Sequence, residues 1–237
     1  MMKRIALYFL LISTITLCCT REHETLSGYQ KDVISYFKDV ALGFELGTTT
    51  HVVRKWDHDM KIFVGGTPTT VLTAELNRII DEINGLTSAD DFSISITTDS
   101  LESNCYLFFG AGTTFAGVIP FFADQIENNL GLFYVYFDNV ENLDQAVVYV
   151  DMVRTTEVAI QKHLLREELT QSLGLARDSE KYPESIFQQS WTDVTEYAPI
   201  DRALIRLLYQ PDIKTGLDEN SVEPVLEKLV VDLNISE

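Results

Sequence analysis

The sequence predicts an α+β fold in which a mixed β-sheet packs against a helix over residues 158–173. Leu165, Leu169 and Leu173 recur at the spacing of three to four residues that turns one stripe of a helix inward. Gly174 directly follows the last of them, and a glycine there supplies the left-handed turn that ends a helix. Runs rich in strand-forming residues precede this helix, so a sheet is expected beside it.

Periodicity also places the remaining elements. Apolar residues at helical spacing predict helices over 26–44, 70–84, 199–209 and 222–233. Alternating, β-branched and aromatic runs predict strands over 93–97, 106–109, 132–137 and 146–153. Residues 48–64 are typical of two strands that meet at a turn.

The glycine-rich segment 110–122 begins like a dinucleotide-binding fingerprint. Phe115 stands where the third glycine is required, and no Lys-Ser or Lys-Thr pair follows Gly117, so no phosphate-binding pattern is met. We expect a flexible, partly apolar loop whose exposed aromatic side chains form a candidate contact surface.

The first residues are typical of a secretory leader. Lys3 and Arg4 precede an apolar run that ends in Cys18 and Cys19. A cysteine at the end of such a run favours lipid attachment, at either Cys18 or Cys19; ordinary secretion with cleavage near Cys19 is the alternative. The expected organisation is a leader over 1–19, a tether over 20–30 and one domain over 31–237.

The charge balance limits the partners. The formal net charge is -18, and loss of Lys3 and Arg4 with the leader would leave -20. No basic stripe exists that could neutralise phosphates, so nucleic acid is excluded, and attachment to a membrane is expected through acyl chains alone. Cys105 lies in a strand-like run and is expected to be a small buried apolar residue.

The central helix can be aligned with the zinc-peptidase pattern H-E-x-x-H-x-x-G through its glycine. Glu167 then occupies the first ligand position, Glu168 the position of the general base and Gln171 the second ligand position. Only the base is retained. We therefore expect no metal and no cofactor, because one carboxylate and one amide without imidazole or thiolate make an unusual zinc site.

Four sequence segments together resemble a known family: R-K-W-D at 54–57, L-R-E-E-L-T-Q-S-L-G-L at 165–175, S-I-F at 185–187 and the run from Tyr197 to Leu217. They are similar to the bacterial envelope family catalogued as domain of unknown function 2927, whose members resemble zincin-fold proteins with a degenerate H-E-x-x-H motif. The resemblance implies a zincin-like fold and a place in the bacterial cell envelope, and it implies no established reaction.

The same resemblance assigns two further positions. Arg177 stands where longer zincin motifs have a third histidine, and a guanidinium cannot become a metal ligand. Phe187 stands in the position of the methionine turn, where it would keep an apolar floor. We hypothesise that Arg177 replaces the missing metal charge through an ion pair with Glu167.

Two neighbouring side chains complete the set of candidates. His163 precedes Glu167 by four residues, a spacing that allows a shared metal but more often gives a simple hydrogen-bonded contact. Asp178 could join Glu167 and Gln171 around a hard ion such as calcium, but no clustered loop of carboxylates supports this.

The function expected from the sequence is non-catalytic: a lipid-anchored envelope protein that binds a peptide or protein partner in the cleft beside its sheet edge. The first alternative is a hydrolase that uses Glu168 as general base. The second is a purely structural envelope component.

Overall fold

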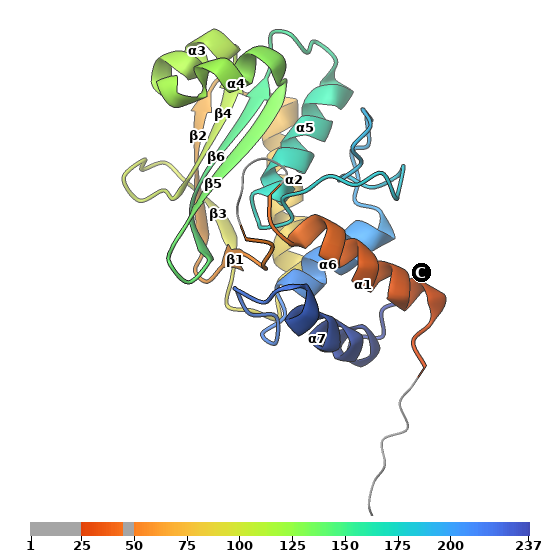
Figure 1. The fold of residues 1–237 in the computed structure, drawn as a ribbon. Coiled ribbons are helices and arrows are strands. Elements are labelled where there is room, and N and C mark those ends of the chain that lie inside the picture. Colours follow the sequence, from red (N-terminus) through yellow and green to blue (C-terminus); the bar gives the residue numbers. More distant parts are fainter. Residues whose placement is uncertain (1–24, 45–49) are drawn as a thin grey trace, which may run out of the picture.

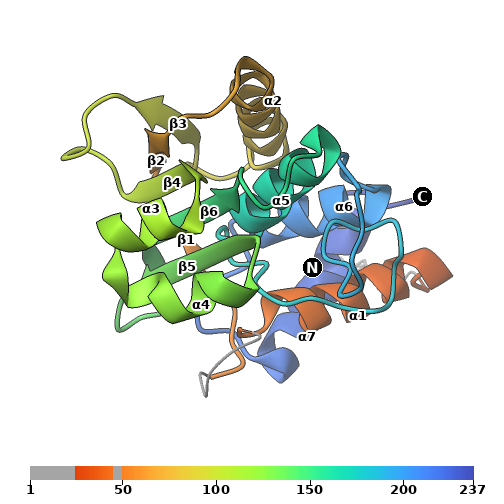
Figure 2. The same cartoon turned by 90° about the horizontal axis from the view of Figure 1, so that it is seen from above.

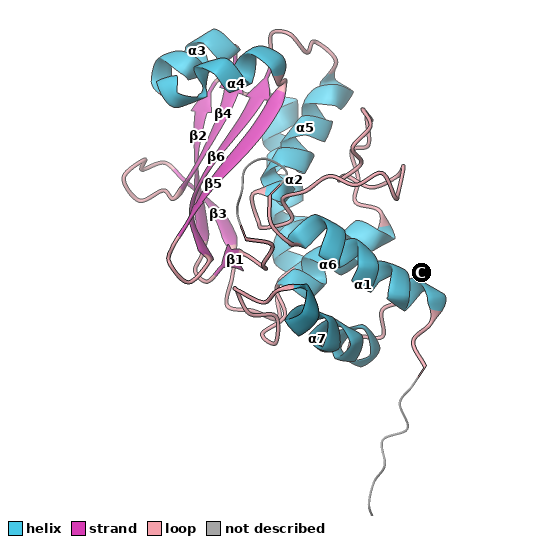
Figure 3. Cartoon of the chain, viewed as in Figure 1, coloured by secondary structure: helices cyan, strands magenta, loops and turns pink. Residues whose placement is uncertain are grey.

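The computed structural model describes residues 25–44 and 50–237, so the predicted leader with Cys18 and Cys19 lies outside the described residues. The helices are α1 (Gly28–Ala41), α2 (Thr70–Leu86), α3 (Gly112–Val118), α4 (Ala123–Asn128), α5 (Val158–Gln171), α6 (Pro199–Leu208) and α7 (Glu219–Asp232), with a short 3-10 helix η1 (Pro120–Phe122) (Figure 1). The strands are β1 (Lys55–Trp56), β2 (Met60–Gly66), β3 (Ile94–Thr97), β4 (Cys105–Gly110), β5 (Gly131–Phe137) and β6 (Asn142–Asp151) (Figure 3).

The strands form one mixed sheet with the order β1-β6-β4-β2-β3. All neighbours in this path are parallel, whereas β5 pairs with β6 in the antiparallel direction. Helices α2 and α5 lie on one side of the sheet, and α3 and α4 cover one end of it (Figures 1 and 2). The α+β prediction is therefore confirmed at the level of a mixed sheet packed on a central helix.

Local sequence explains where several helices begin. The Ser27 hydroxyl accepts from the Gln30 backbone N–H, and the Gln30 side chain accepts from the Ser27 N–H, which makes a capping box at the start of α1. At the start of α2, the Thr69 hydroxyl accepts from the Leu72 backbone N–H, a side-chain cap without the reciprocal contact. Helix α1 thus begins inside the stretch predicted as a tether.

The predicted inward faces of the first two long helices are confirmed. In α1, Val33, Phe37 and Val40 are fully buried, and in α2, Leu72 and Ile79 are fully buried. These side chains belong to one large apolar core that also includes the inner face of the sheet and helices α5, α6 and α7. Helices α1, α6 and α7 contact one another beyond α5.

The prediction of a flexible loop over 110–122 is wrong. The segment forms α3 and η1 and continues into α4, and Phe115 and Phe122 are buried against Phe108 and Tyr149 in a second apolar cluster. Apolar residues at 115, 119, 122 and 126 follow helical spacing, which explains the burial. Of the expected exposed aromatics, Phe121 remains, with 61% of its surface exposed.

Residues 48–64 also differ from the prediction. They supply β1 and β2, but these strands do not pair with each other: β1 lies beside β6, and β2 lies between β3 and β4. A parallel sheet joins sequence-distant strands, so adjacency along the chain is a poor guide to pairing here.

Candidate functional site

Helix α5 lies against the sheet, beside α2 on the same side of it (Figure 2). It contacts β5 and β6 on one side and α2 on the other. Leu165, Leu169 and Leu173 are fully buried, as predicted. Six polar residues of this helix are buried as well, each at most 8% exposed: Gln161, His163, Arg166, Glu168, Thr170 and Gln171. Every polar group on this helix therefore requires a partner.

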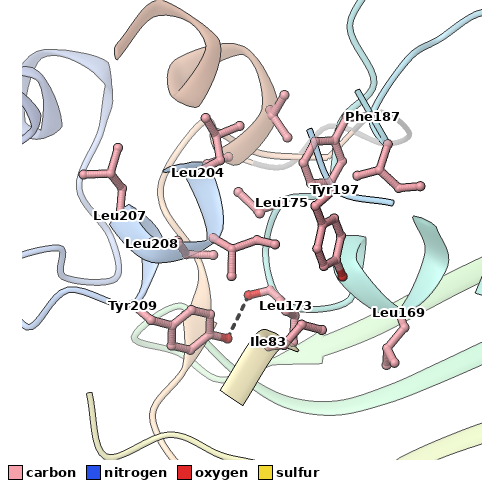
Figure 4. Packing of buried hydrophobic residues seen from close by; sticks show 14 of the residues in the cluster. Ile83, Leu169, Leu173, Leu175, Phe187, Tyr197, Leu204, Leu207, Leu208 and Tyr209 are labelled. Carbon is pink, nitrogen blue, oxygen red and sulfur yellow. Dashed lines mark hydrogen bonds between the residues drawn. The ribbon is translucent and has the colours of Figure 1, made fainter. Parts of the chain in front are cut away.

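The end of α5 is fixed by groups from distant parts of the chain. The Trp56 indole N–H donates to Ser172 O at 2.9 Å, and the Tyr209 hydroxyl donates to Leu173 O at 3.1 Å (Figure 4). Gly174 has φ +110, and a Cβ there would overlap the Arg54 carbonyl oxygen. The predicted glycine stop is confirmed, three residues beyond the last helical residue, Gln171.

Glu168, in the position of the general base, lies against the first residue of β5. Its side chain is 8% exposed, and a Cβ added to Gly131 would overlap its Oε1. A glycine at 131 is thus required for the antiparallel strand to approach this carboxyl group. The structure brings Glu168 directly beside the sheet edge.

The carboxylate of Glu167 is paired with the side chain of His163. His163 Nε2 lies 3.2 Å from Glu167 Oε2, and its Nδ1 lies 2.7 Å from Val194 O. Burial disfavours the charged ring, but the carboxylate and carbonyl together outweigh this effect and raise the pKa of His163. The pair is the hydrogen-bonded contact that the i,i+4 spacing favours, and it attaches the loop after residue 178 to α5.

The remaining ligand positions do not fit a zinc ion. The Gln171 amide donates to Asp178 Oδ1 at 2.6 Å, and both ring nitrogens of His163 are already engaged. Over residues 25–44 and 50–237, no three His, Cys, Asp or Glu side chains are grouped so that they could hold a metal. This donor set is one carboxylate, one amide and a committed imidazole, which differs from known zinc sites.

The hypothesis of an ion pair between Arg177 and Glu167 is wrong. In the described part of the chain, no carboxylate lies within ion-pair distance of the Arg177 guanidinium, and Glu167 instead contacts His163. The Arg177 backbone N–H donates to Val40 O at 3.2 Å, and Arg177 is one of the residues that line a pocket beside α1. Helix α5 ends before Gly174, so positions 167 and 177 do not lie on the same helix.

A buried ionic cluster that the sequence analysis missed joins α5 to α2. Arg166 is fully buried; its guanidinium contacts Glu75 at 3.2 Å and Glu82 at 3.0 Å and stacks 4.2 Å from the Tyr197 ring centroid. Burial opposes ionisation of Glu75, but hydrogen bonds from Arg78, Lys162 and Arg166 outweigh it and lower the pKa of Glu75. The acidic residues lie at 75 and 82, two turns apart, on a helix that is otherwise apolar inward.

A second missed network holds the S-I-F segment. Asp201 is fully buried and accepts from Ser185 Oγ at 2.6 Å, from Ala198 N–H at 2.9 Å and from Ile186 N–H at 3.1 Å. It therefore caps the start of α6 and fixes the loop that carries Phe187, which is fully buried (Figure 4). The Asp201 carboxyl group thus joins two of the segments that carry the family resemblance, S-I-F at 185–187 and the run over 197–217.

The described residues form a single mixed α/β domain built around the buried helix α5. The chain belongs to the family described as "Protein of unknown function (DUF2927)", which matches residues 30–228. No curated protein matches the chain. Within the described ranges, no helix has both the length and the apolar character needed to cross a membrane.

Proposed function

We propose that this protein is a zincin-like, non-catalytic binding protein that holds an extended peptide segment against the free edge of β5. In this proposal a lipid on Cys18 or Cys19 attaches it to the bacterial cell envelope. The single observation that carries the binding role is the position of β5: it is the antiparallel edge strand, it runs beside α5, and its first residue abuts Glu168.

The register of β5 shows which backbone groups are available. Asp151 N–H donates to Leu130 O at 2.8 Å, and these two residues lie directly opposite each other in the pairing with β6. Hydrogen-bonded and non-bonded pairs alternate in an antiparallel ladder, so the N–H and C=O groups of Gly131, Phe133 and Val135 point away from β6. In the described residues β5 pairs with no strand except β6. An added peptide strand would use these groups.

The state of the old site supports binding without turnover. Glu167 and Gln171, the two ligand positions, are already held by His163 and Asp178. Strand β5 still lies beside the central helix α5 and could align a peptide. The two ligand positions serve internal contacts and would not take part in turnover.

Peptide selection tests the proposal. Extended decapeptides selected on the intact protein should bind, and Val135→Pro should weaken binding at least about tenfold because it removes an outward N–H from the edge. Val135→Ala is the matched control: it shortens the same side chain and keeps the N–H, so binding should persist. Failure to select any peptide, or equal binding by both variants, would contradict the proposal.

One observation favours a hydrolase as the second candidate. Glu168 is buried beside the strand on which a substrate would lie, where a general base would be required. Cleavage of the selected peptides by the native protein, abolished in Glu168→Gln, would establish this alternative in place of pure binding.

A further inference from the structure

A pocket of about 280 Å³ lies beside α1, and Arg177 is one of the residues that line it. Residues of α1, the first residue of α7 and two connecting segments form its walls. Its polar lining consists of Ser35, Lys38, Asp39, His51, Arg177 and Glu219. Neither the edge of β5 nor Glu168 belongs to this lining, so the pocket is separate from the site discussed above.

Lysines already neutralise the acidic groups of the wall. Asp39 forms an ion pair with Lys181, whose ammonium also donates to Ser35 Oγ at 2.8 Å. Lys38 lies 3.3 Å from Glu219 Oε1 and 2.8 Å from Glu223 Oε2. These contacts pair the wall carboxylates with lysines, and within the described residues none of these carboxylates forms an ion pair with Arg177.

Arg177 is the exception among the buried or half-buried arginines. The side chains of the others in the described residues each pair with a carboxylate: Arg54, Arg78, Arg166 and Arg202. Arg177 is half-buried, and in the part of the chain that the structure describes no oxygen accepts a hydrogen bond from its guanidinium. A planar guanidinium that is partly withdrawn from water offers two parallel N–H donors to an incoming oxyanion.

We propose that this pocket binds a carboxylate group, such as the C-terminus or an acidic side chain of a peptide, through a bidentate contact with Arg177. The three nearby cations, Lys38, Lys181 and Arg177, balance the three carboxylates of Asp39, Glu219 and Glu223, so these six side chains together carry no net charge. The formal net charge of the whole chain is -18, so a group of charged side chains whose charges balance differs from the chain as a whole. The balanced charge of the pocket favours a ligand with a single negative charge. A phosphate dianion would place a second negative charge beside the wall carboxylates of Asp39 and Glu219.

The test is an NMR titration of the full chain with N-acetylglycine, observed at the Arg177 Nε–Hε group. We expect saturable binding of N-acetylglycine and none of N-acetylglycinamide, which has the same shape without the charge. Arg177→Gln should raise the dissociation constant at least about tenfold, since it removes a charge-assisted bidentate contact. Arg206→Gln is the matched control: Arg206 is exposed and lies outside the pocket, so this change should leave the constant unaltered.

Arg177→Lys keeps the positive charge and replaces the planar fork, so it should weaken binding at least about threefold even if Arg177→Gln fails to fold. Unchanged affinity in Arg177→Gln or Arg177→Lys would overturn the proposal. Equal binding of the amide, or tighter binding of inorganic phosphate than of N-acetylglycine, would overturn the assignment to a carboxylate. The result is independent of whether a peptide adds to β5.

Discussion

Asp201 offers a quantitative test of how the core beside α6 is held. Its carboxyl group is fully buried, and burial raises its pKa to about 6, against the opposing effect of the hydrogen bonds from Ser185, Ile186 and Ala198. A pKa above the ordinary value of 3.8 means that the folded state binds the proton more tightly than the unfolded chain does. The stability that this group contributes is therefore fully present below about pH 3.8 and is lost as the pH rises through about 6.

The perturbation is Asp201→Asn, which keeps the shape and removes the titration. One pKa unit is worth about 1.36 kcal/mol, so the difference between 3.8 and about 6 corresponds to roughly 3 kcal/mol. The free energy of unfolding of the native protein minus that of the variant should fall by this amount between about pH 4 and pH 7. The side-chain amide of the variant has one acceptor oxygen fewer than the carboxyl group. The cost of that loss does not change with pH, so it shifts the difference in the free energy of unfolding by the same amount at every pH.

Urea unfolding of both proteins at four pH values over this range measures the difference. Subtraction removes contributions from Glu75 and Asp151, whose lowered pKa values act with the opposite sign in both proteins. Two parallel curves would refute the reasoning, because they would show that the buried carboxyl group titrates alike in the folded and unfolded states.

Three further predictions concern α5. Arg166→Ala should destabilise the fold by about 3–5 kcal/mol, measured by urea unfolding, because it leaves buried carboxylates without their cation. Gly174→Ala should lower the free energy of unfolding by more than about 1 kcal/mol, since alanine rarely adopts φ +110 and its Cβ would overlap backbone. The raised pKa of His163 implies stability that is fully present below the ordinary value of 6.5 and lost as the pH rises through the higher folded value; in His163→Gln this loss should vanish from pH-dependent unfolding. Matched controls are Arg206→Ala, on an exposed position, and Gly85→Ala, whose Cβ meets nothing within 4 Å and which should be neutral or stabilising. A loss below about 1 kcal/mol for Arg166→Ala, equal effects of the two glycine changes, or an unaltered pH profile in His163→Gln would contradict the respective prediction.

The helical insert at 112–128 shows how a local signal can be misread. Glycine and proline suggested a loop, and the single phenylalanine in a fingerprint position drew attention away from the spacing of Phe115, Ile119, Phe122 and Ile126. Three of these four side chains are buried. Burial of one apolar stripe on the sheet outweighed the helix-breaking tendency of Gly117 and Pro120.

The sequence by itself determined the long amphipathic helices, most strands, the stop at Gly174 and the absence of histidine from positions 167 and 171, because each follows from residues close together in the chain. Only the tertiary structure decided that β1 lies beside β6, that Arg166 meets Glu75 and Glu82, that Asp201 holds Ser185, and that Glu167 pairs with His163 and not with Arg177. These contacts join residues far apart in sequence, and their partners are chosen by which buried charge or backbone group must be satisfied once the sheet and helices have packed.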